Sequence, residues 1–194
     1  MIIFDLDGTL ADCQHRRHFV DPLSSRPHGE DYSLSLYSPD LNMYYYNLYA
    51  NGKRGFFYHK TNKRWEPDWK SFYEACDQDE VILPIYFIFL SLKEKFGIEH
   101  PIQIWSGRCE SVKDKTIHWL QKHFSRDIYW VKHLKMRPIG DSTPDDELKE
   151  RWLDETIIEG KNIDFVFDDR PKVIKMWRRR GVFVFNCAQY DEEF

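Results

Sequence analysis

Two carboxylates near the start of the chain have the spacing that hydrolysis of a phosphomonoester requires. Asp5 and Asp7 follow the apolar residues 2–4, so both side chains would project to the same side of a strand end, and Gly8 permits a sharp turn. A phosphate dianion repels anions, so the reaction needs a positioned nucleophile, a cation and a proton donor. Asp5 could form an aspartyl-phosphate while Asp7 protonates the leaving group and then activates water. An ordinary acidic turn is the alternative interpretation.

A second polar cluster follows the apolar residues 102–105. Ser106, Gly107 and Arg108 could bind phosphoryl oxygens through a hydroxyl, backbone N–H groups and a guanidinium. Taken alone, this cluster is more typical of a helix N-cap, in which Ser106 or a nearby residue satisfies the start of a helix. Its assignment to a site therefore depends on the other clusters.

The third cluster, Asp168, Asp169 and Arg170, follows the apolar residues 165–167. Paired carboxylates at the end of a strand do not stabilise a fold unless a cation or an arginine neutralises them. We predict that Asp168 is a metal ligand and that Asp169 pairs with Arg170 or with another arginine facing the substrate. A purely structural cluster of ion pairs is the alternative.

Two further basic residues, Arg137 and Lys149, could balance the charge of a phosphate. On charge pattern alone, however, Lys149 is typical of a solvated helical residue, because acidic residues surround it. These neighbours are Asp145, Asp146, Glu147 and Glu150.

The apolar runs that precede the clusters predict buried strands. A fourth run, 182–185, follows Gly181. Helical patterns cover residues 81–96, 110–124, 144–153 and 171–180, with Pro84 and Pro171 suited to a first turn and Gly181 to a helix stop. Strands alternating with helices predict an α/β fold with a mostly parallel sheet flanked by helices. In such sheets ligands bind beyond the carboxyl ends of the strands, so the three clusters should converge.

Residues 24–68 break this alternation and predict a small aromatic-rich, β-containing insertion after the first strand. Aromatic triplets at 44–46 and 56–58 flank Asn51-Gly52, which is a hairpin signal. We therefore predict a core of residues 1–23 and 69–194 and a cap-like insertion of residues 24–68. The aromatic side chains favour a core of the insertion's own, and stacking on a nucleobase is the alternative.

The composition narrows the class of protein. A chain of 194 residues that is 42% hydrophobic can bury the core of one main domain. The net charge of -4 provides no basic field for wrapping duplex nucleic acid, although contact with a strand end stays open. The four cysteines lack metal-ligand spacing, which predicts reduced thiols and a cytoplasmic protein. With no signal-like or membrane-spanning stretch, we expect no membrane partner.

The last predicted helix carries a basic face. Val173, Ile174 and Trp177 are expected to form its buried side. The face could contact a nucleic-acid backbone or could simply be solvated, and the sequence leaves both interpretations open. Its basic residues are Lys172, Lys175, Arg178, Arg179 and Arg180.

These motifs resemble, in chain order, the four motifs of the haloacid dehalogenase (HAD) superfamily of phosphatases. The likeness is carried by residues 4–10 (FDLDGTL), then Ser106, Lys149 and the pair Asp168 and Asp169. More narrowly, the chain resembles the phosphatase domain of phage-type polynucleotide kinase/3′-phosphatase over residues 1–20 and 66–194. The motifs concerned are 105–108 (WSGR), 136–141 (MRPIGD), 145–149 (DDELK), 167–170 (FDDR) and 176–179 (MWRR).

The resemblance implies a Rossmann-like fold and a Mg2+ ion held by Asp5, the backbone carbonyl of Asp7, and Asp168. It implies that Ser106 and Lys149 contact the phosphate and join Asp5 and Asp7 as catalytic residues. The substrate-binding residues are then expected to be Thr9, Gly107, Arg108, Arg137, Asp169 and Arg170.

Two features depart from that family. The chain contains no G-x-x-x-x-G-K-[ST] sequence, so we expect no kinase activity. The aromatic insertion has no counterpart in the phosphatase domain that the chain resembles, so more than one class of substrate stays open.

The sequence thus predicts a Mg2+-dependent HAD-type phosphatase that removes 3′-phosphate from polynucleotide ends. A (deoxy)nucleoside monophosphate phosphatase, with the insertion closing over a single base, is the second hypothesis. A non-catalytic module that binds nucleic-acid ends is the third. The expected partner is a nucleic-acid 3′ end or a nucleotide, and a separate kinase or ligase is a candidate protein partner.

Overall fold

The computed structural model of the chain describes residues 1–20, 34–38, 43–47, 54–59, 65–96, 100–124 and 132–188. The chain divides into two compact units. One consists of Met1–Asp12 and Asp77–Phe194, and the other is Cys13–Cys76. All of the candidate site residues belong to the first unit.

A parallel sheet forms the centre of the first unit. Its strands are β1 (Ile2–Phe4), β8 (Ile102–Cys109), β9 (Leu134–Arg137), β10 (Phe165–Asp168) and β11 (Val184–Asn186). They form a five-stranded sheet in the order β11-β10-β1-β8-β9, and every neighbouring pair is parallel. Phe4 lies opposite both Ile104 and Phe167, so the carboxyl ends of β1, β8 and β10 are adjacent. The predicted parallel sheet is confirmed.

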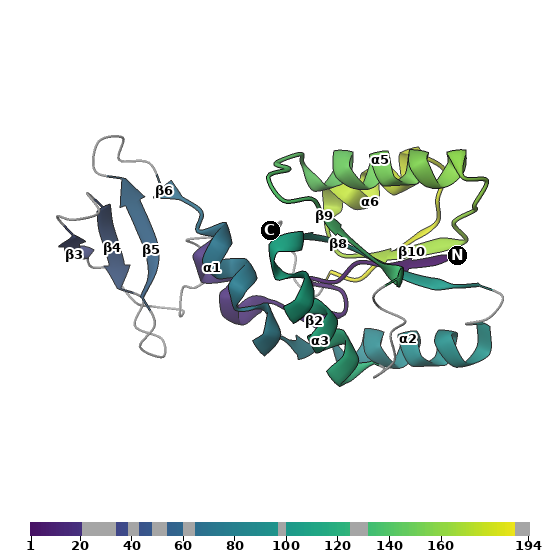
Figure 1. Ribbon diagram of the computed structural model, residues 1–194, viewed down its shortest axis with the longest axis horizontal. Coiled ribbons are helices and arrows are strands. Elements are labelled where there is room, and N and C mark those ends of the chain that lie inside the picture. Colours follow the sequence, from purple (N-terminus) through teal and green to yellow (C-terminus); the bar gives the residue numbers. More distant parts are fainter. Residues whose placement is uncertain are drawn as a thin grey trace. The chain divides into compact units, whose positions relative to one another are not determined.

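Helices cover both faces of this sheet (Figure 1). α2 (Leu83–Phe96) and α3 (Lys113–His123) lie on one face, and α5 (Asp145–Ile158) and α6 (Pro171–Arg179) lie on the other. Pro171 is the first residue of α6, and Gly181 follows that helix with a φ of 74°. Both residues act as the boundary signals that the sequence predicted. The fold is the predicted α/β class.

Aromatic packing fixes the strands on both faces. Trp105 of β8 packs against Trp152 of α5 and Trp177 of α6, with 5.8 Å between the ring centroids in each pair. All three rings are buried. On the opposite face, Phe4 stacks on Phe167 at a centroid distance of 4.3 Å. Burying such rings provides much of the free energy that holds the strand ends in register.

Some element boundaries differ from the predictions. β8 runs through to Cys109, so Ser106 and its neighbours lie within an irregular strand end and not after it. α5 extends to Ile158 and not to residue 153. β9 was not predicted, because only Leu134 and Met136 alternate with polar residues there, and two apolar positions are too few to indicate a strand.

A short antiparallel pair lies where the chain leaves and re-enters the first unit. In this pair β2 (Ala11–Asp12) lies against β7 (Glu80–Val81), with Ala11 opposite Val81. The N–H of Ile82 donates to the carbonyl of Leu10 at 2.9 Å and extends the pairing. The loop that follows Asp5 is therefore tied to the segment that returns from the second unit.

The second unit contains an antiparallel sheet, as predicted for the insertion. Its strands, in spatial order, are β3 (Leu34–Ser38), β4 (Met43–Asn47), β5 (Arg54–His59) and β6 (Trp65–Glu66). A 3-10 helix (Gln14–Phe19) and α1 (Trp69–Glu74) belong to the same unit. The predicted Asn51-Gly52 turn lies outside the described residues. The choice between packing and base stacking for the aromatic side chains stays a prediction.

The basic helix α6 has the buried side that the sequence predicted. Val173, Ile174 and Trp177 are buried. Arg179 pairs with Glu150, and Arg180 pairs with both Glu150 and Asp154 of α5 at 3.0 and 2.5 Å. These two arginines thus hold α6 against α5. The contact of this helix with a nucleic-acid backbone stays a prediction.

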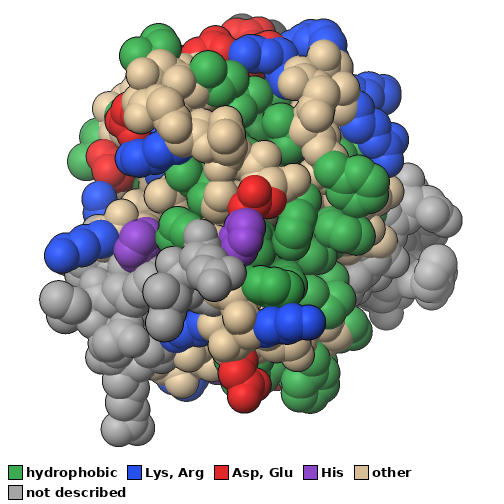
Figure 2. Space-filling view, turned by 90° about the vertical axis from the view of Figure 1, so that its right-hand side faces the viewer, with side chains coloured by type: hydrophobic (Ala, Val, Ile, Leu, Met, Phe, Trp, Pro, Cys, Tyr) green, Lys and Arg blue, Asp and Glu red, His purple; other side chains and the backbone are tan. Residues whose placement is uncertain are grey.

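Hydrophobic side chains also reach the surface, and Figure 2 shows them gathered on one face beside acidic and histidine side chains. The large exposed hydrophobic residues of the described chain include Phe183 and Phe185 near the edge strand β11.

Within the described residues, no helix combines the length and the apolar character needed to cross a bilayer.

Candidate active site

Three carboxylates meet at the carboxyl edge of the parallel sheet. Asp5 follows β1, Asp168 ends β10, and Asp169 comes next. Each offers an oxygen that lies within 4.8 Å of the other two. The N–H of Asp5 also donates to the carbonyl of Phe167 at 2.9 Å, which locks the two strand ends together. Asp5 and Asp168, predicted to share a metal ion, are close enough to do so.

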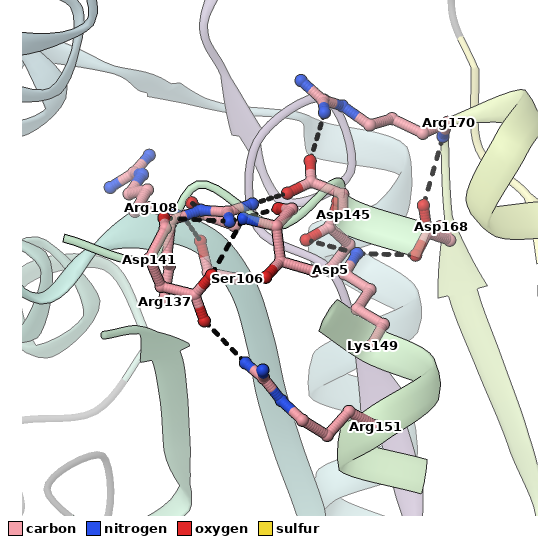
Figure 3. Close-up of polar contacts among 12 residues, drawn as sticks. Asp5, Ser106, Arg108, Arg137, Asp141, Asp145, Lys149, Arg151, Asp168 and Arg170 are labelled. Atoms are coloured by element: carbon pink, nitrogen blue, oxygen red, sulfur yellow. Dashed lines mark hydrogen bonds and ion pairs between the residues drawn. The ribbon is translucent and has the colours of Figure 1, made fainter. Parts of the chain in front are cut away.

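Lys149 of α5 links two of these carboxylates. Its buried Nζ lies 3.0 Å from Asp5 Oδ1 and 2.8 Å from Asp168 Oδ2 (Figure 3). Burial alone would lower the pKa of Lys149, but the carboxylates of Asp168 and Asp5 outweigh it and raise that pKa above its ordinary value. The solvated interpretation of Lys149 from charge pattern is therefore wrong, and its ammonium group is a fixed positive charge inside the cluster.

The acidic groups of the cluster are nonetheless under-neutralised. Burial raises the pKa of Asp5, and Asp168 and Asp169 raise it further against the opposing effect of Lys149. Burial likewise raises the pKa of Asp169 to about 7, with Asp168 adding to the shift and Arg170 opposing it. The raised pKa values show that the ionised carboxylates are not fully balanced by the positive charges around them, so a bound cation would stabilise their ionised form. Oxygen donors of this kind suit a hard divalent cation such as Mg2+, so the residues fit the predicted ion.

A tight turn carries the residues that follow Asp5. The carbonyl of Leu6 accepts hydrogen bonds from the N–H groups of Leu10 and Ala11 at 2.9 and 2.8 Å. Gly8 has a φ of 81°, and Asp169 packs directly against its Cα, where a side chain would otherwise lie. Thr9 Oγ1 donates to Asp169 Oδ1 at 3.2 Å. The turn therefore holds the side chain of Asp169 in place. Thr9 was predicted to bind substrate, and in the structure its hydroxyl contacts the Asp169 carboxylate.

Replacing Gly8 by alanine should cost more stability than the same change at Gly160. Both glycines have positive φ values, 81° and 71°, and would be strained by a side chain. A Cβ on Gly8 would lie 2.0 Å from Asp169 Oδ2, whereas nothing lies within 4 Å of a Cβ on Gly160. We expect Gly160→Ala to lower the free energy of unfolding by about 1 kcal/mol and Gly8→Ala by about 2–4 kcal/mol. Urea titrations of both variants would measure the difference, and equal losses would contradict the clash.

The contacts of Arg108 differ from those predicted. Its guanidinium is fully buried, and its Nε donates to both carboxylate oxygens of Asp7 at 2.9 and 3.0 Å. Its Nη2 lies 2.5 Å from both Asp7 Oδ1 and Asp79 Oδ2. The guanidinium of Arg108 thus contacts two carboxylates of the protein, and its role in binding substrate stays a prediction. Asp79 was not predicted at all, because nothing in its local sequence distinguishes it.

Ser106 is buried, and its Oγ accepts a hydrogen bond from the N–H of Arg108 at 3.2 Å. Ser106 lies inside β8 and caps no helix. The nearby Cys109 does cap the 3-10 helix Glu110–Val112, because its Sγ accepts a hydrogen bond from the N–H of Ser111 at 3.5 Å, so the alternative interpretation holds for that residue. The neighbouring Gly107 makes room for Asp145, because a Cβ at this position would lie 2.6 Å from Asp145 Oδ1. Both residues shape the strand end around the carboxylate cluster.

Asp145 joins two of the predicted arginines (Figure 3). One oxygen accepts from Arg137 and the other from Arg170. Arg137 also donates to the carbonyls of Gly107 at 3.0 Å and Thr143 at 2.5 Å, so it ties β8 to the segment before α5. Predicted to bind substrate, Arg137 is thus held by protein groups. The sequence analysis named Asp145 only as an acidic neighbour of Lys149, and its ion pairs with two arginines were not predicted.

Arg170 is the predicted arginine that remains open to solvent near the cluster. Its side chain is 25% exposed, and its N–H donates to Asp168 Oδ1 at 3.1 Å. Arg170 also forms an ion pair with Asp145, and the predicted pairing of Asp169 with Arg170 or with another arginine stays a prediction. Beside it lies a pocket of about 190 Å³ lined by Pro144, Asp145, Asp146, Arg170, Pro171, Lys172 and Val173.

Comparison with known proteins identifies relatives of this chain. A family model described as the phosphatase domain of polynucleotide kinase PNKP matches residues 59–192. A protein of Autographa californica nuclear polyhedrosis virus, whose name proposes a bifunctional polynucleotide kinase/RNA ligase, is 37% identical over 93 residues. The match covers 47% of this chain and 13% of the viral protein.

Two solved structures of the Pnkp1/Rnl/Hen1 RNA repair complex contain a chain of similar fold. The TM-scores are 0.55 and 0.56, and the sequence identities are 22% and 23%. Both matches cover 95% of this chain but only 41% and 44% of the chains in the complex. This chain therefore spans less than half the length of the relatives that it matches.

Proposed function

Because the chain belongs to the family of polynucleotide kinase PNKP phosphatase domains, we propose that it is a Mg2+-dependent phosphatase that removes 3′-phosphate from polynucleotide ends. The observation that carries the proposal is the cluster at the sheet edge, in which Lys149 lies against Asp5 and Asp168, and Asp169 completes the group of carboxylates within 4.8 Å of one another. In the proposal, this cluster supplies the nucleophile, a fixed positive charge and the ligands for a cation.

The first half of the proposed reaction transfers the phosphoryl group to the protein. A carboxylate oxygen of Asp5 attacks phosphorus, the bond to the ester oxygen breaks, and the departing oxygen takes a proton from Asp7. Asp5, the backbone carbonyl of Asp7, and Asp168 would hold Mg2+, which when bound offsets the charge of the phosphate. Lys149 contributes its charge on the same side, and Ser106 contacts the phosphoryl oxygens.

The second half releases phosphate. Asp7, now ionised, accepts a proton from water, and the resulting hydroxide attacks phosphorus as the bond to the Asp5 oxygen breaks. Inorganic phosphate leaves, and both carboxyl groups return to their starting forms. The bidentate contact of Arg108 keeps Asp7 in place through both steps.

The substrate is proposed from the relatives and from Arg170. Names of the relatives refer to polynucleotide kinase, RNA ligase and RNA repair, so phosphate at a strand end is the substrate that fits them. Arg170, partly exposed between the cluster and the pocket, could contact the adjoining phosphodiester. Because these relatives are longer than this chain, we propose that kinase and ligase activities reside outside it, with a ligase or kinase as a candidate partner.

A substrate panel tests the proposal. Phosphate release would be measured for one oligonucleotide carrying either a 3′- or a 5′-phosphate, and for deoxynucleoside 3′- and 5′-monophosphates, each with Mg2+ and with EDTA. We expect the 3′-phosphorylated oligonucleotide to be preferred and EDTA to stop the reaction. Preference for a mononucleotide would favour the nucleotide phosphatase, and binding of oligonucleotides without release from any ester would favour a non-catalytic module. Transfer of phosphate from ATP to a 5′-hydroxyl would contradict the expected lack of kinase activity.

Mg2+ should stabilise the fold, and more strongly at about pH 8 than at about pH 6. The pKa of Asp169 is raised to about 7 by burial, and that of Asp5 is raised as well, so ionising these groups in the absence of a cation costs folding free energy. A cation binds the ionised carboxylates, so its stabilising effect is full above this pKa and declines as the pH falls through it. At about 100 times the dissociation constant the gain is about 2.7 kcal/mol, or roughly 5–10 °C in Tm.

Thermal unfolding with MgCl2, and with NaCl at the same ionic strength, would measure the effect. In Asp168→Asn the Mg2+-dependent shift should largely disappear, because a proposed ligand is removed. A shift that NaCl reproduces, or one that is independent of pH, would show that the ion does not bind at these carboxylates.

A further inference from the structure

Asp79 lies outside every motif that the sequence analysis singled out, yet it contacts the proposed catalytic machinery through Arg108. Asp79 Oδ2 lies 2.5 Å from Arg108 Nη2, and both side chains are fully buried. The same guanidinium binds Asp7 through Nε and Nη2. Arg108 therefore pairs with two carboxylates. Asp7 comes before residues 13–76 of the second unit in the sequence, and Asp79 comes after them.

Asp79 is itself held firmly. Its carbonyl accepts a hydrogen bond from Trp119 Nε1 of α3 at 2.7 Å, and Trp119 is buried. The next two residues form β7, which pairs with β2 just after the reactive turn. The Asp79 carboxylate is thus fixed relative to the turn that carries Asp7, from two directions.

A charged group in this position is a poor choice for stability alone. Removing a carboxylate from water costs free energy that a buried ion pair often does no more than offset, and a hydrophobic residue of similar size would serve the fold as well. The Asp79 carboxylate instead contributes to the orientation of the Arg108 guanidinium. The guanidinium is planar, and a second acceptor on Nη2 fixes its rotation, which in turn fixes the plane of the Asp7 carboxylate bound to its Nε edge.

Asp7 differs from its two partners in that its side chain is 17% exposed, whereas Arg108 and Asp79 are sealed off from solvent. Orientation therefore matters most at Asp7, which must present an oxygen to the ester. Without Asp79, the arginine could meet Asp7 through a single N–H, or turn toward a bound phosphate. Either change would leave the proton donor misaligned while the nucleophile and the cation ligands stayed in place.

We propose that Asp79 is a positioning residue that, through Arg108, orients Asp7 for proton transfer to the leaving group. The inference rests on the proposed phosphatase function. Loss of Asp79 would affect the proton donor and not the nucleophile, because Asp5, Lys149 and Asp168 do not depend on Asp79 for their contacts with one another.

The test compares two esters that differ in their need for a proton. An alkyl leaving group, such as the 3′ oxygen of an oligonucleotide, departs poorly unless it is protonated, whereas 2,4-dinitrophenolate departs without a proton. For Asp79→Asn we expect the single-turnover rate constant for cleavage of the 3′-phosphate ester of the oligonucleotide to fall about 10²-fold, since general acid catalysis contributes about 10²–10⁴-fold. On 2,4-dinitrophenyl phosphate we expect the single-turnover rate constant for release of 2,4-dinitrophenolate to change less than about 3-fold. Single-turnover measurements isolate the first half-reaction, because the attack of water that Asp7 also assists is common to both esters.

Two further variants make the result specific. Asp7→Asn should show the same dependence on the leaving group, and adding Asp79→Asn to it should cause little further loss, because both act on one proton transfer. Asp77→Asn, in the same segment but 44% exposed and 4.0 Å from Lys115, serves as the matched control and should match the parent. Asp79→Glu, which keeps the charge beside Arg108 but displaces the carboxylate by one methylene, covers the case in which Asp79→Asn folds poorly, and should show the same selective loss.

Equal losses on the two esters would overturn the inference, because a partly unfolded protein loses both activities alike. Parent-like activity of Asp79→Asn on the oligonucleotide would overturn it too. Failure of the proposed function is distinguishable, because the parent protein would then release no phosphate from either ester.

Discussion

Asp5→Asn should abolish phosphate release, with a loss of at least about 10⁴-fold in kcat, because the side chain that would form the covalent intermediate is gone. The change is nearly isosteric and removes one negative charge from a cluster in which burial already raises the pKa of Asp5. We therefore expect the variant without Mg2+ to be at least as stable as the parent protein. Loss of activity without loss of stability would mark Asp5 as a chemical participant.

The measurement combines phosphate release with trapping of the intermediate. Acid-quenched parent protein should carry a phosphoryl group that hydroxylamine removes, and Asp5→Asn should carry none. Asp154→Asn is a matched control, because Asp154 is 53% exposed and pairs only at the surface with Arg180 among its described contacts. Substantial turnover by Asp5→Asn would disprove the nucleophilic role.

Lys149→Met should impair both activity and stability. Removing the ammonium group leaves the carboxylates of Asp5 and Asp168 buried beside one another without their shared partner. Breaking a buried pair in this way costs about 3–5 kcal/mol, so we expect a loss of that size in the free energy of unfolding without Mg2+. The loss of a fixed positive charge beside the phosphate should also lower kcat by about 10²–10³-fold.

Mg2+ separates these two effects. A bound cation should restore part of the stability of Lys149→Met, because it takes over neutralisation of the carboxylates, but it should not restore kcat. Lys161→Met, at a lysine that is 54% exposed and pairs with Glu159, provides the control and should behave like the parent in both assays. Full activity of Lys149→Met at saturating Mg2+ would show that the ammonium group acts only on folding.

The positions of the acidic groups could be predicted because they depend on a simple rule. Apolar runs that end in Asp5, Ser106 and Asp168 predict parallel strands, and the carboxyl ends of such strands meet at one edge. The structure places these groups together for that reason. Helix α6 was also predictable, since Pro171 and Gly181 bound it and its buried residues have helical spacing.

The partners of the basic groups could not be predicted in this way. Whether Arg108 binds a phosphate or a protein carboxylate depends on Asp79, which lies in another part of the chain and reaches Arg108 only after folding. The same holds for Arg137, which donates to the backbone carbonyls of Gly107, Asp141 and Thr143. Every residue carries a backbone carbonyl, so the side chains in the sequence do not indicate which carbonyls will meet an arginine. The end of α5 was a different case, because Gly160, with a φ of 71°, offered a stop signal that was not used.

Adjacency of β1 and β10 in the sheet has a consequence for biosynthesis. Ile2 and Phe165 are register partners, so the strand that contains Ile2 acquires this neighbour only after Phe165 has been synthesised. A nascent chain halted before residue 165 would present Asp5 without its companion carboxylates. Such long-range pairing slows folding, and we expect competence for catalysis to emerge only after translation of this region is complete.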